Sequence, residues 1–186
     1  FPEEGKYHFD GHRKCHICLS PAEAEAQGGI CPVCQKRLTM GVSHRIAQLA
    51  DRPEGFVPEK AKPFESLVPL LEVIAASTGR SAAGKKVREE YETMIRKLGT
   101  EFAILREVPI EDIKRECGYL TAEGIRRLRE GKVERLPGFD GEYGAVRLFT
   151  PDEIESPEGQ DEHERPVRDG DGFRGRKQNG VWLRET

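Results

Sequence analysis

The chain has 186 residues, which is enough for one ordinary domain or for two small ones. Charged residues make up 34% of it, and no apolar run approaches the length of a membrane helix or of a signal peptide's core, so we predict a soluble protein without a membrane partner. The formal charge of -3 is uneven, because residues 1–149 are nearly neutral, residues 150–172 are acidic and the last fourteen residues are basic. The chain starts with Phe1 rather than methionine, and we therefore expect it to be a piece of a longer protein.

The first fourteen residues contain three potential metal ligands close together, His8, Asp10 and His12. A helical zinc site of the HExxH type is excluded, because Phe9 stands where the general-base glutamate would be. We expect an extended segment in which His8 and His12 pack on, or hydrogen-bond to, the ligands of the cysteine site that follows. A second metal ion or a catalytic Asp–His pair is the alternative.

Two matching cysteine pairs follow, each with the CxxC spacing, and their members are Cys15, Cys18, Cys31 and Cys34. Two thiolates three residues apart in a tight turn point the same way, so each pair can hold one side of a tetrahedral ion. The pattern predicts a zinc ribbon with four cysteine ligands, in which no coordination position is open for chemistry. The binding free energy of such sites, on the order of 10 kcal/mol, would be folding free energy here.

Other uses of the four cysteines are less favoured. Pairs in adjacent turns make poor structural disulfides, and no βαβ pattern surrounds either pair, as a redox-active CxxC would require. Iron held by four thiolates stays open, since ligand type alone does not separate it from zinc. Metal-type spacing fits a reducing cytoplasm, where we place the protein, better than secretion. The remaining cysteine, Cys117, is expected to be a small buried side chain rather than a nucleophile.

Behind the cysteines, Val42, Ile46 and Leu49 recur at helical spacing and predict a short helix packed on the ribbon. Prolines and a glycine then mark residues 51–63 as a linker. Apolar residues beyond it predict helices at residues 67–77 and 82–98. Pro109 at a first helical turn and Thr121 as a cap predict two more, at residues 109–117 and 121–129. The glycine-rich stretch 131–149 predicts a loop with one or two short strands.

The predicted fold class is α+β and mainly helical. A zinc-ribbon domain occupies residues 1–50, and a helical domain with short strands at its end occupies residues 64–149. Residues 150–186 are expected to be an acidic, disordered tail or tether, because low hydrophobicity and a high charge prevent a packed core. A weak hairpin pattern surrounds Asn179-Gly180 within it.

Basic residues in two places are candidates for contacts with nucleic-acid phosphates. The first group rims the cysteine site and consists of Arg13, Lys14, Lys36, Arg37 and Arg45. The second group lies in the helical domain and consists of Lys85, Lys86, Arg126, Arg129 and Lys132. Lys85 and Lys86 stand at a glycine-rich helix start, whose free amides attract anions. For both groups, an ordinary solvated surface is the alternative.

Residues 79–86 almost spell a nucleotide-binding P-loop. Lys86 stands where the magnesium-binding serine or threonine is needed, and a helical pattern precedes the loop where a strand is required. We therefore predict no nucleotide site.

A combination of short motifs carries a family resemblance: Gly5-Lys6-Tyr7-His8, Cys31-Pro32-Val33-Cys34, Ala50-Asp51-Arg52-Pro53, Ala122-Glu123-Gly124-Ile125-Arg126 and Pro137-Gly138-Phe139-Asp140-Gly141-Glu142-Tyr143-Gly144. Over residues 1–149 the chain resembles the endonuclease Q family. The resemblance implies a zinc-binding domain followed by a helical domain, preceded in family members by a PHP metal-dependent nuclease domain. It also implies a parent protein that nicks DNA on the 5′ side of deaminated bases.

The metal-binding motifs of a PHP domain have no counterpart in this chain, so the resemblance implies no catalytic residues here. Its implied partners are DNA containing deaminated bases and the PHP domain of the same protein. Some bacterial relatives resemble fusions with a UvrD-type helicase, which makes residues 150–186 a candidate tether to such a module.

Three functions follow from these patterns. The leading one is the DNA-binding part of an endonuclease Q-like repair protein. The second is a zinc-stapled protein-interaction module that couples a nuclease to a helicase. The third is an active nuclease that uses His8, Asp10 and His12.

Overall fold

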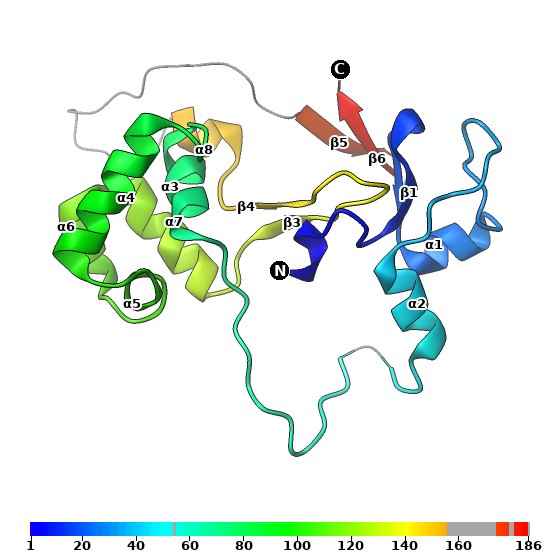
Figure 1. The fold of residues 1–186 in the computed structure, drawn as a ribbon, viewed down its shortest axis with the longest axis horizontal. Coiled ribbons are helices and arrows are strands. Elements are labelled where there is room, and N and C mark those ends of the chain that lie inside the picture. Colours follow the sequence, from blue (N-terminus) through cyan, green and yellow to red (C-terminus); the bar gives the residue numbers. More distant parts are fainter. Residues whose placement is uncertain (54, 156–173, 179–180, 186) are drawn as a thin grey trace. The chain divides into compact units, whose positions relative to one another are not determined.

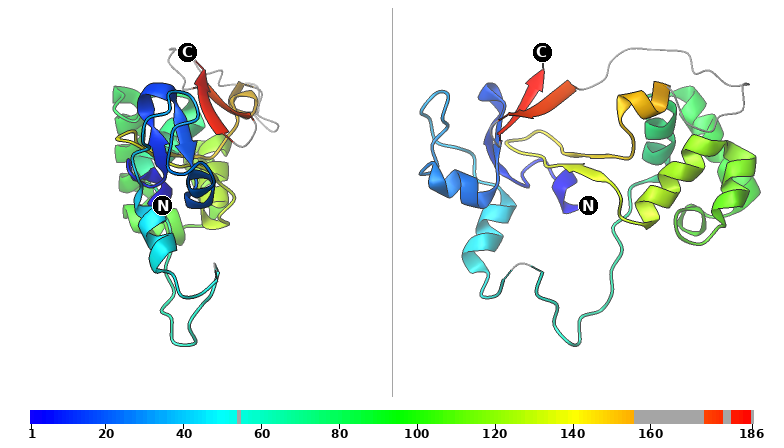
Figure 2. Two further views of the ribbon diagram at one scale, coloured as in Figure 1. Left: turned by 90° about the vertical axis from the view of Figure 1, so that its right-hand side faces the viewer. Right: turned by 180° about the vertical axis from the view of Figure 1, so that it is seen from behind.

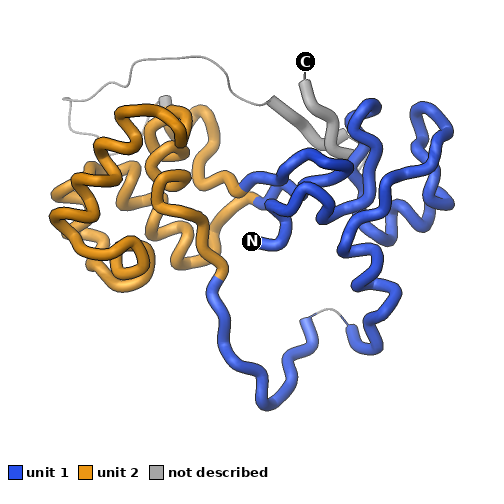
Figure 3. Tube along the Cα trace, viewed as in Figure 1, with its two compact units in different colours: residues 1–65, 135–145, 171–186 blue, residues 66–134, 146–170 orange. Residues whose placement is uncertain are grey.

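The structure is a computed structural model that describes residues 1–53, 55–155, 174–178 and 181–185. In these residues the chain forms helices and two-stranded sheets (Figure 1). It divides into two compact units (Figure 3). Unit 1 comprises residues 1–65, 135–145 and 171–186, and unit 2 comprises residues 66–134 and 146–170.

Unit 1 is built on a hairpin of two short strands. Its elements in chain order are the 3₁₀ turn η1 (Pro2–Glu4), β1 (Asp10–His12), the 3₁₀ turn η2 (Arg13–Cys15), β2 (Ile17–Leu19), α1 (Pro21–Ala26) and α2 (Val42–Leu49). Ser20 caps α1 in a reciprocal arrangement, because its side chain accepts from the amide of Glu23 while the Glu23 carboxylate accepts from the amide of Ser20. Residues 50–69, outside position 54, contain no helix or strand, and the turned views show this stretch as an extended path (Figure 2).

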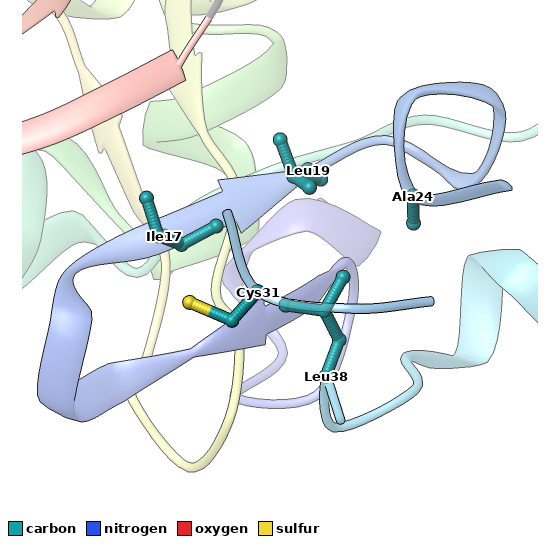
Figure 4. Close-up of a cluster of buried hydrophobic side chains, with 5 residues drawn as sticks. All are labelled: Ile17, Leu19, Ala24, Cys31 and Leu38. Carbon is teal, nitrogen blue, oxygen red and sulfur yellow. The ribbon is translucent and has the colours of Figure 1, made fainter. Parts of the chain in front are cut away.

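The core of unit 1 lies on one face of the hairpin. It consists of Ile17, Leu19, Ala24, Cys31 and Leu38, drawn in Figure 4. Ile17 and Leu19 alternate with Cys18 along β2, so the strand period of two places Cys18 on the opposite face. This small cluster leaves much of the unit's stability to other interactions.

Residues 135–145 return to unit 1 after the helical stretch, although the sequence pattern placed them in the second domain. Backbone hydrogen bonds hold them against the N-terminal segment: Phe9 N–H donates to Gly138 O (2.9 Å), Gly138 N–H to Glu3 O (2.8 Å) and Gly144 N–H to Glu4 O (3.0 Å). A Cβ atom at Gly138 or Gly144 would collide with backbone atoms of this contact.

Unit 2 is helical, as predicted. It contains α3 (Leu70–Thr78), α4 (Lys85–Leu98), α5 (Glu101–Arg106), α6 (Ile110–Cys117), α7 (Tyr119–Arg129) and α8 (Pro151–Glu155). The short strands β3 (Glu134–Leu136) and β4 (Ala145–Arg147) connect it with the returning segment. The helix α5 was not predicted from the sequence. In the structure Thr100 is its N-cap, and the Thr100 side chain accepts a hydrogen bond from the amide of Ala103.

The core of unit 2 is formed by apolar side chains of its helices. Val87 and Met94 of α4, Ile113 of α6 and Ile125 of α7 are fully buried. At Gly124 the helices α3 and α7 come close, since a Cβ there would lie 2.9 Å from Ser77 Oγ and 3.3 Å from Val73 Cγ1. Cys117, predicted to be buried, is half-buried, and burial raises the pKa of its thiol to about 11.

The predicted acidic tail begins with an ordered turn. Thr150 caps α8 through reciprocal hydrogen bonds with Glu153. The amide of Thr150 donates to the Glu153 carboxylate at 2.7 Å, and the Thr150 hydroxyl oxygen accepts from the amide of Glu153. Residues 156–173 lie outside the described part of the chain, as do the turn residues 179–180 of the expected C-terminal hairpin. The flanking strands β5 (Arg174–Gln178) and β6 (Val181–Glu185) pair antiparallel, with Gln178 opposite Val181. Among the described helices, none has the length and apolar composition needed to cross a bilayer.

Candidate metal centre and basic surface

Four side chains of unit 1 gather their metal-binding atoms in one place: His12, Cys15, Cys31 and Cys34. These atoms all lie within 4.8 Å of one another, and Cys34 Sγ is 3.4 Å from His12 Nδ1. A tetrahedral zinc site with bonds of about 2.0 to 2.3 Å has ligand separations of about 3.3 to 3.8 Å. The set therefore fits one tetrahedral ion after small side-chain movements.

The cluster differs by one residue from the set that the cysteine spacing predicted, because His12 stands in place of Cys18. The reason is the register of the hairpin, in which His12 lies opposite Ile17 and Gly11 lies opposite Cys18. Opposed residues share a face, so Cys18 points away from the cluster and its Sγ lies 3.9 Å from Pro137 O. His12 and Cys15 have the same three-residue spacing as a CxxC pair. This spacing could have indicated His12 as a ligand, but counting cysteines alone favoured Cys18 instead.

A tight turn presents the second cysteine pair. The amide of Cys31 donates to Lys36 O at 2.7 Å, the amide of Gln35 donates to Cys31 O at 2.9 Å, and Gln35 adopts a left-handed φ of 60°. Cys31 is fully buried and belongs to the apolar core of Figure 4, which ties the centre to the fold. The four ligands leave no open position, so an ion held here would act by stabilising the fold.

The thiols influence one another's protonation. Burial, followed by hydrogen bonds with Cys34 and Cys31, raises the pKa of Cys15 to about 11. A backbone hydrogen bond from Lys36 lowers the pKa of Cys34. A metal ion requires thiolates, so its binding must release protons from this crowded group.

His8 and Asp10, the other candidates of the N-terminal segment, have partners away from the cluster. His8 stacks on Phe9 with 4.9 Å between ring centroids, its nitrogens lie 3.3 and 3.4 Å from Ser43 Oγ, and burial lowers its pKa. Asp10 is 1% exposed and accepts from Gly41 N–H and from His44 Nδ1, each at 2.6 Å. The structure thus brings His12 alone of the three to the metal cluster.

The basic residues predicted around the cysteine site lie on the surface of unit 1. Arg13, Lys14, Lys36, Arg37 and Arg45 are all exposed. Arg45 donates to the side chain of Gln48 at 3.1 Å. Within the described residues, none of the five forms an ion pair, so their charges stay available to an anionic partner.

The basic residues predicted in unit 2 have a different environment. Arg129 donates to three carbonyl oxygens, those of Leu105 (2.9 Å), Ile104 (2.8 Å) and Val108 (2.7 Å), and desolvation by burial lowers its pKa. This side chain closes the C-terminal end of α5 and is not free for a phosphate.

Arg126 and Lys132 are neutralised by neighbouring carboxylates. Arg126 contacts Glu123 at 2.6 Å and Glu130 at 2.7 Å, and Lys132 contacts Glu130 at 2.7 Å. Lys85 and Lys86 are exposed at the start of α4, where Lys85 lies 3.7 Å from Glu89. The element before residues 79–86 is the helix α3, whereas a P-loop must follow a strand.

The helix α2 formed as predicted, but its apolar stripe is not packed on the ribbon. Val42, Ile46 and Leu49 are 59%, 60% and 64% exposed. The N-terminus of α2 is held instead by its backbone, since the amides of Val42 and Ser43 donate to Tyr7 O and His8 O.

Comparisons with known proteins place these features in context. A family model described as the MJ0043 C-terminal domain matches residues 69–132. The chain is 32% identical over 154 residues to the uncharacterized protein MJ0043 of Methanocaldococcus jannaschii, covering 83% of this chain and 19% of that protein. It is also 32% identical over 147 residues to the uncharacterized protein YqxK of Bacillus subtilis, covering 78% of this chain and 34% of that protein.

Two solved structures share the fold. The lesion-specific endonuclease PfuEndoQ of Pyrococcus furiosus is 30% identical with a TM-score of 0.69, over 85% of this chain and 40% of the other. An endonuclease Q in complex with a 27-mer duplex substrate carrying an abasic lesion is 32% identical with a TM-score of 0.68, over 82% of this chain and 38% of the other. The chain spans about a fifth and about a third of the two curated relatives and about two fifths of the solved endonucleases. It is therefore similar, over most of its length, to one portion of a lesion-specific endonuclease.

Proposed function

We propose that this chain is the DNA-binding portion of an endonuclease Q-like repair protein that nicks DNA 5′ of deaminated bases, with the catalytic PHP domain outside the chain. The similarity in sequence and fold to an endonuclease solved with a DNA duplex is the observation that carries this proposal. The basic side chains around the metal centre support it, because they have no carboxylate partner among the described residues and such cations can displace counterions from phosphates.

In this proposal the metal is zinc, held by His12, Cys15, Cys31 and Cys34, and its role is structural. Imidazole and thiolates are ligands that zinc favours, although thiolates also suit iron. Zinc would fix the hairpin and the Cys31–Cys34 turn, from which Arg13, Lys14, Lys36 and Arg37 project. Those side chains would hold the backbone without reading sequence, which suits lesion repair. They would help offset the few kcal/mol that extruding a base costs.

The test is binding of the full chain to a labelled duplex that contains deoxyinosine, at several salt concentrations. About five phosphate contacts give a slope of about -4.5 in a plot of log affinity against log salt. A matched duplex without the lesion separates phosphate binding from lesion recognition. The chain alone, with magnesium or manganese, is expected to leave the duplex intact; a nick would revive the nuclease hypothesis for His8, Asp10 and His12.

A second candidate is a zinc-stapled interaction module that links a nuclease to a UvrD-type helicase. The exposed apolar stripe of α2 favours it, since contiguous apolar side chains on a surface are typical of protein interfaces. The absence of DNA binding at every salt concentration, from a chain that retains its metal, would support this candidate against the first.

A further inference from the structure

Two exposed tyrosines of unit 1 share one lysine. Lys6 Nζ lies 5.8 Å from the ring centroid of Tyr7 and 5.6 Å from that of Tyr143. Tyr7 is 46% exposed and Tyr143 is 77% exposed, so both side chains are accessible to a ligand. Large aromatic side chains are usually buried in a folded protein, and two of them beside one cation form a distinctive surface.

The backbone beneath these side chains is firmly held. Gly141 N–H donates to Lys6 O at 2.9 Å, Val42 N–H donates to Tyr7 O at 2.8 Å, and Gly144 N–H donates to Glu4 O at 3.0 Å. Phe139 and Glu142 exchange two further backbone hydrogen bonds, of 3.0 and 2.8 Å. The segment that carries Tyr143 is thereby fixed to the one that carries Tyr7, which lowers the entropy cost of ordering both rings around a ligand.

The charge next to the rings is positive. A Cβ atom at Gly141 would lie 3.5 Å from Tyr7 Oη and 3.7 Å from Arg13 Nη1, so both groups lie around this glycine. The nearby acid Asp140 has both carboxylate oxygens engaged, by the amide of Arg13 at 2.7 Å and by Thr39 Oγ1 at 2.6 Å. Lys6 and Arg13 have no ion pair with any residue that the structure describes.

We propose that Tyr7, Lys6 and Tyr143 form a stacking site for an unpaired base of DNA, with Arg13 on an adjoining phosphate. Stacking on aromatic rings tolerates every base, because each base has a π face, and a cation beside the ring adds to the attraction for DNA. A fully paired duplex hides its base faces, so the site would act on a nucleotide that is extruded, bulged or opposite a gap. The inference rests on the proposed DNA binding and adds a preference for unpaired bases.

The experiment compares the metal-loaded full chain on two labelled duplexes of equal length, one fully paired and one with a single bulged adenine. Replacing Tyr143 by alanine is expected to weaken binding to the bulged duplex by about 5- to 150-fold, the range for one base stacked on one aromatic side chain. Binding to the paired duplex is expected to change less than about twofold. Tyr143→Phe, which keeps the ring, is expected to bind both duplexes as the unmodified chain does.

Phe102→Ala is the matched control, because Phe102 is a 68% exposed aromatic residue of unit 2 and far from the proposed site in sequence. A second readout uses 2-aminopurine in the bulge, whose fluorescence falls when it stacks. We expect quenching by the unmodified chain and by Tyr143→Phe, and a weaker effect with Tyr143→Ala.

Equal binding of the bulged duplex by Tyr143→Ala and the unmodified chain would overturn the stacking site while leaving DNA binding intact. An equal loss in Tyr143→Phe and Tyr143→Ala would also overturn it, since the hydroxyl rather than the ring would then be responsible. Failure of the unmodified chain to bind either duplex would overturn the proposed function itself.

Discussion

The basic cluster around the metal centre of unit 1 and the basic cluster at the end of α7 in unit 2 have different environments. In unit 1, Arg13, Lys14, Lys36 and Arg37 are exposed and have no ion pair within the described residues, whereas in unit 2 Arg126, Arg127, Arg129 and Lys132 are bound by carboxylates or carbonyls. Similar sequence clusters thus serve two purposes. A basic run is a candidate for binding an anionic partner only where the fold leaves its charges unmatched.

The largest effect is expected at the metal centre, on which the basic surface of unit 1 depends. Replacing His12 by asparagine or Cys31 by serine should abolish stoichiometric zinc binding and unfold unit 1, since structural zinc contributes about 10 kcal/mol or more to such sites. Metal analysis together with hydrogen exchange of the full chain would measure both results, and unit 2 should stay protected.

Cys18→Ala is the control that distinguishes the observed cluster from the four-cysteine set predicted by spacing. It should keep one equivalent of zinc, because Cys18 lies on the other face of the hairpin. Loss of zinc from Cys18→Ala, with zinc retained by His12→Asn, would restore the original prediction.

The next largest effect, on the stability of unit 2, is expected at Arg129, whose side chain binds carbonyl groups of its own unit. Arg129→Met should reduce the free energy of unfolding by about 2 to 4 kcal/mol, because it leaves three buried or half-buried carbonyl groups without their charged donor. Urea denaturation of unit 2 would show it. Arg126→Met should cost clearly less than Arg129→Met, because the Arg126 side chain is 39% exposed and the carboxylate of Glu123 keeps its second partner, Arg127. An equal loss in both variants would contradict the assigned role.

Removing positive charges from each unit in turn tests the difference between the two basic clusters directly. Changing Lys14, Lys36 and Arg37 to glutamine should lower DNA affinity and reduce the salt slope by about 3, one unit for each phosphate contact. The same number of changes in unit 2, at Arg126, Lys132 and Lys97, should leave the slope unchanged, because the first two already face Glu130 and Lys97 faces Glu116. Equal slopes for the two triple variants would remove the distinction between the units.

The smallest effect is a pH dependence at α8. The hydrogen bond from Arg127, followed by that from the amide of Thr150, lowers the pKa of Glu153 to about 2. A carboxyl group with a depressed pKa stabilises the fold above its ordinary pKa of 4.5, and this contribution is lost as the pH falls toward 2. Because the Glu153 side chain is 40% exposed, solvent screens the ion pair and the loss should be about 0.5 kcal/mol.

Thermal melting of the unmodified chain and of Glu153→Gln between pH 2 and pH 6 would detect this contribution. The two curves should converge at the acidic end and separate above pH 4.5. A constant difference across the range would mean that the ion pair with Arg127 contributes nothing.

Periodic features were predictable from the sequence, and features set by the meeting of distant segments were not. The apolar stripe of Val87, Met94 and Ile95 predicted α4, and the spacing of Cys31 and Cys34 predicted half of the metal centre. The replacement of Cys18 by His12 depends on a strand register that spacing cannot fix. The internal bonds of Arg129 depend on where α5 ends, and that helix was itself missed.

The return of residues 135–145 to unit 1 has a consequence for synthesis on the ribosome. About 70 residues of unit 2 must emerge between the two parts of unit 1, which takes about 4 to 14 seconds at ordinary translation rates. During that interval the backbone groups of Glu3, Glu4 and Phe9 lack the partners they have in the finished protein. Early capture of a metal ion by His12 and the three cysteines would hold the nascent hairpin in shape until the missing piece arrives.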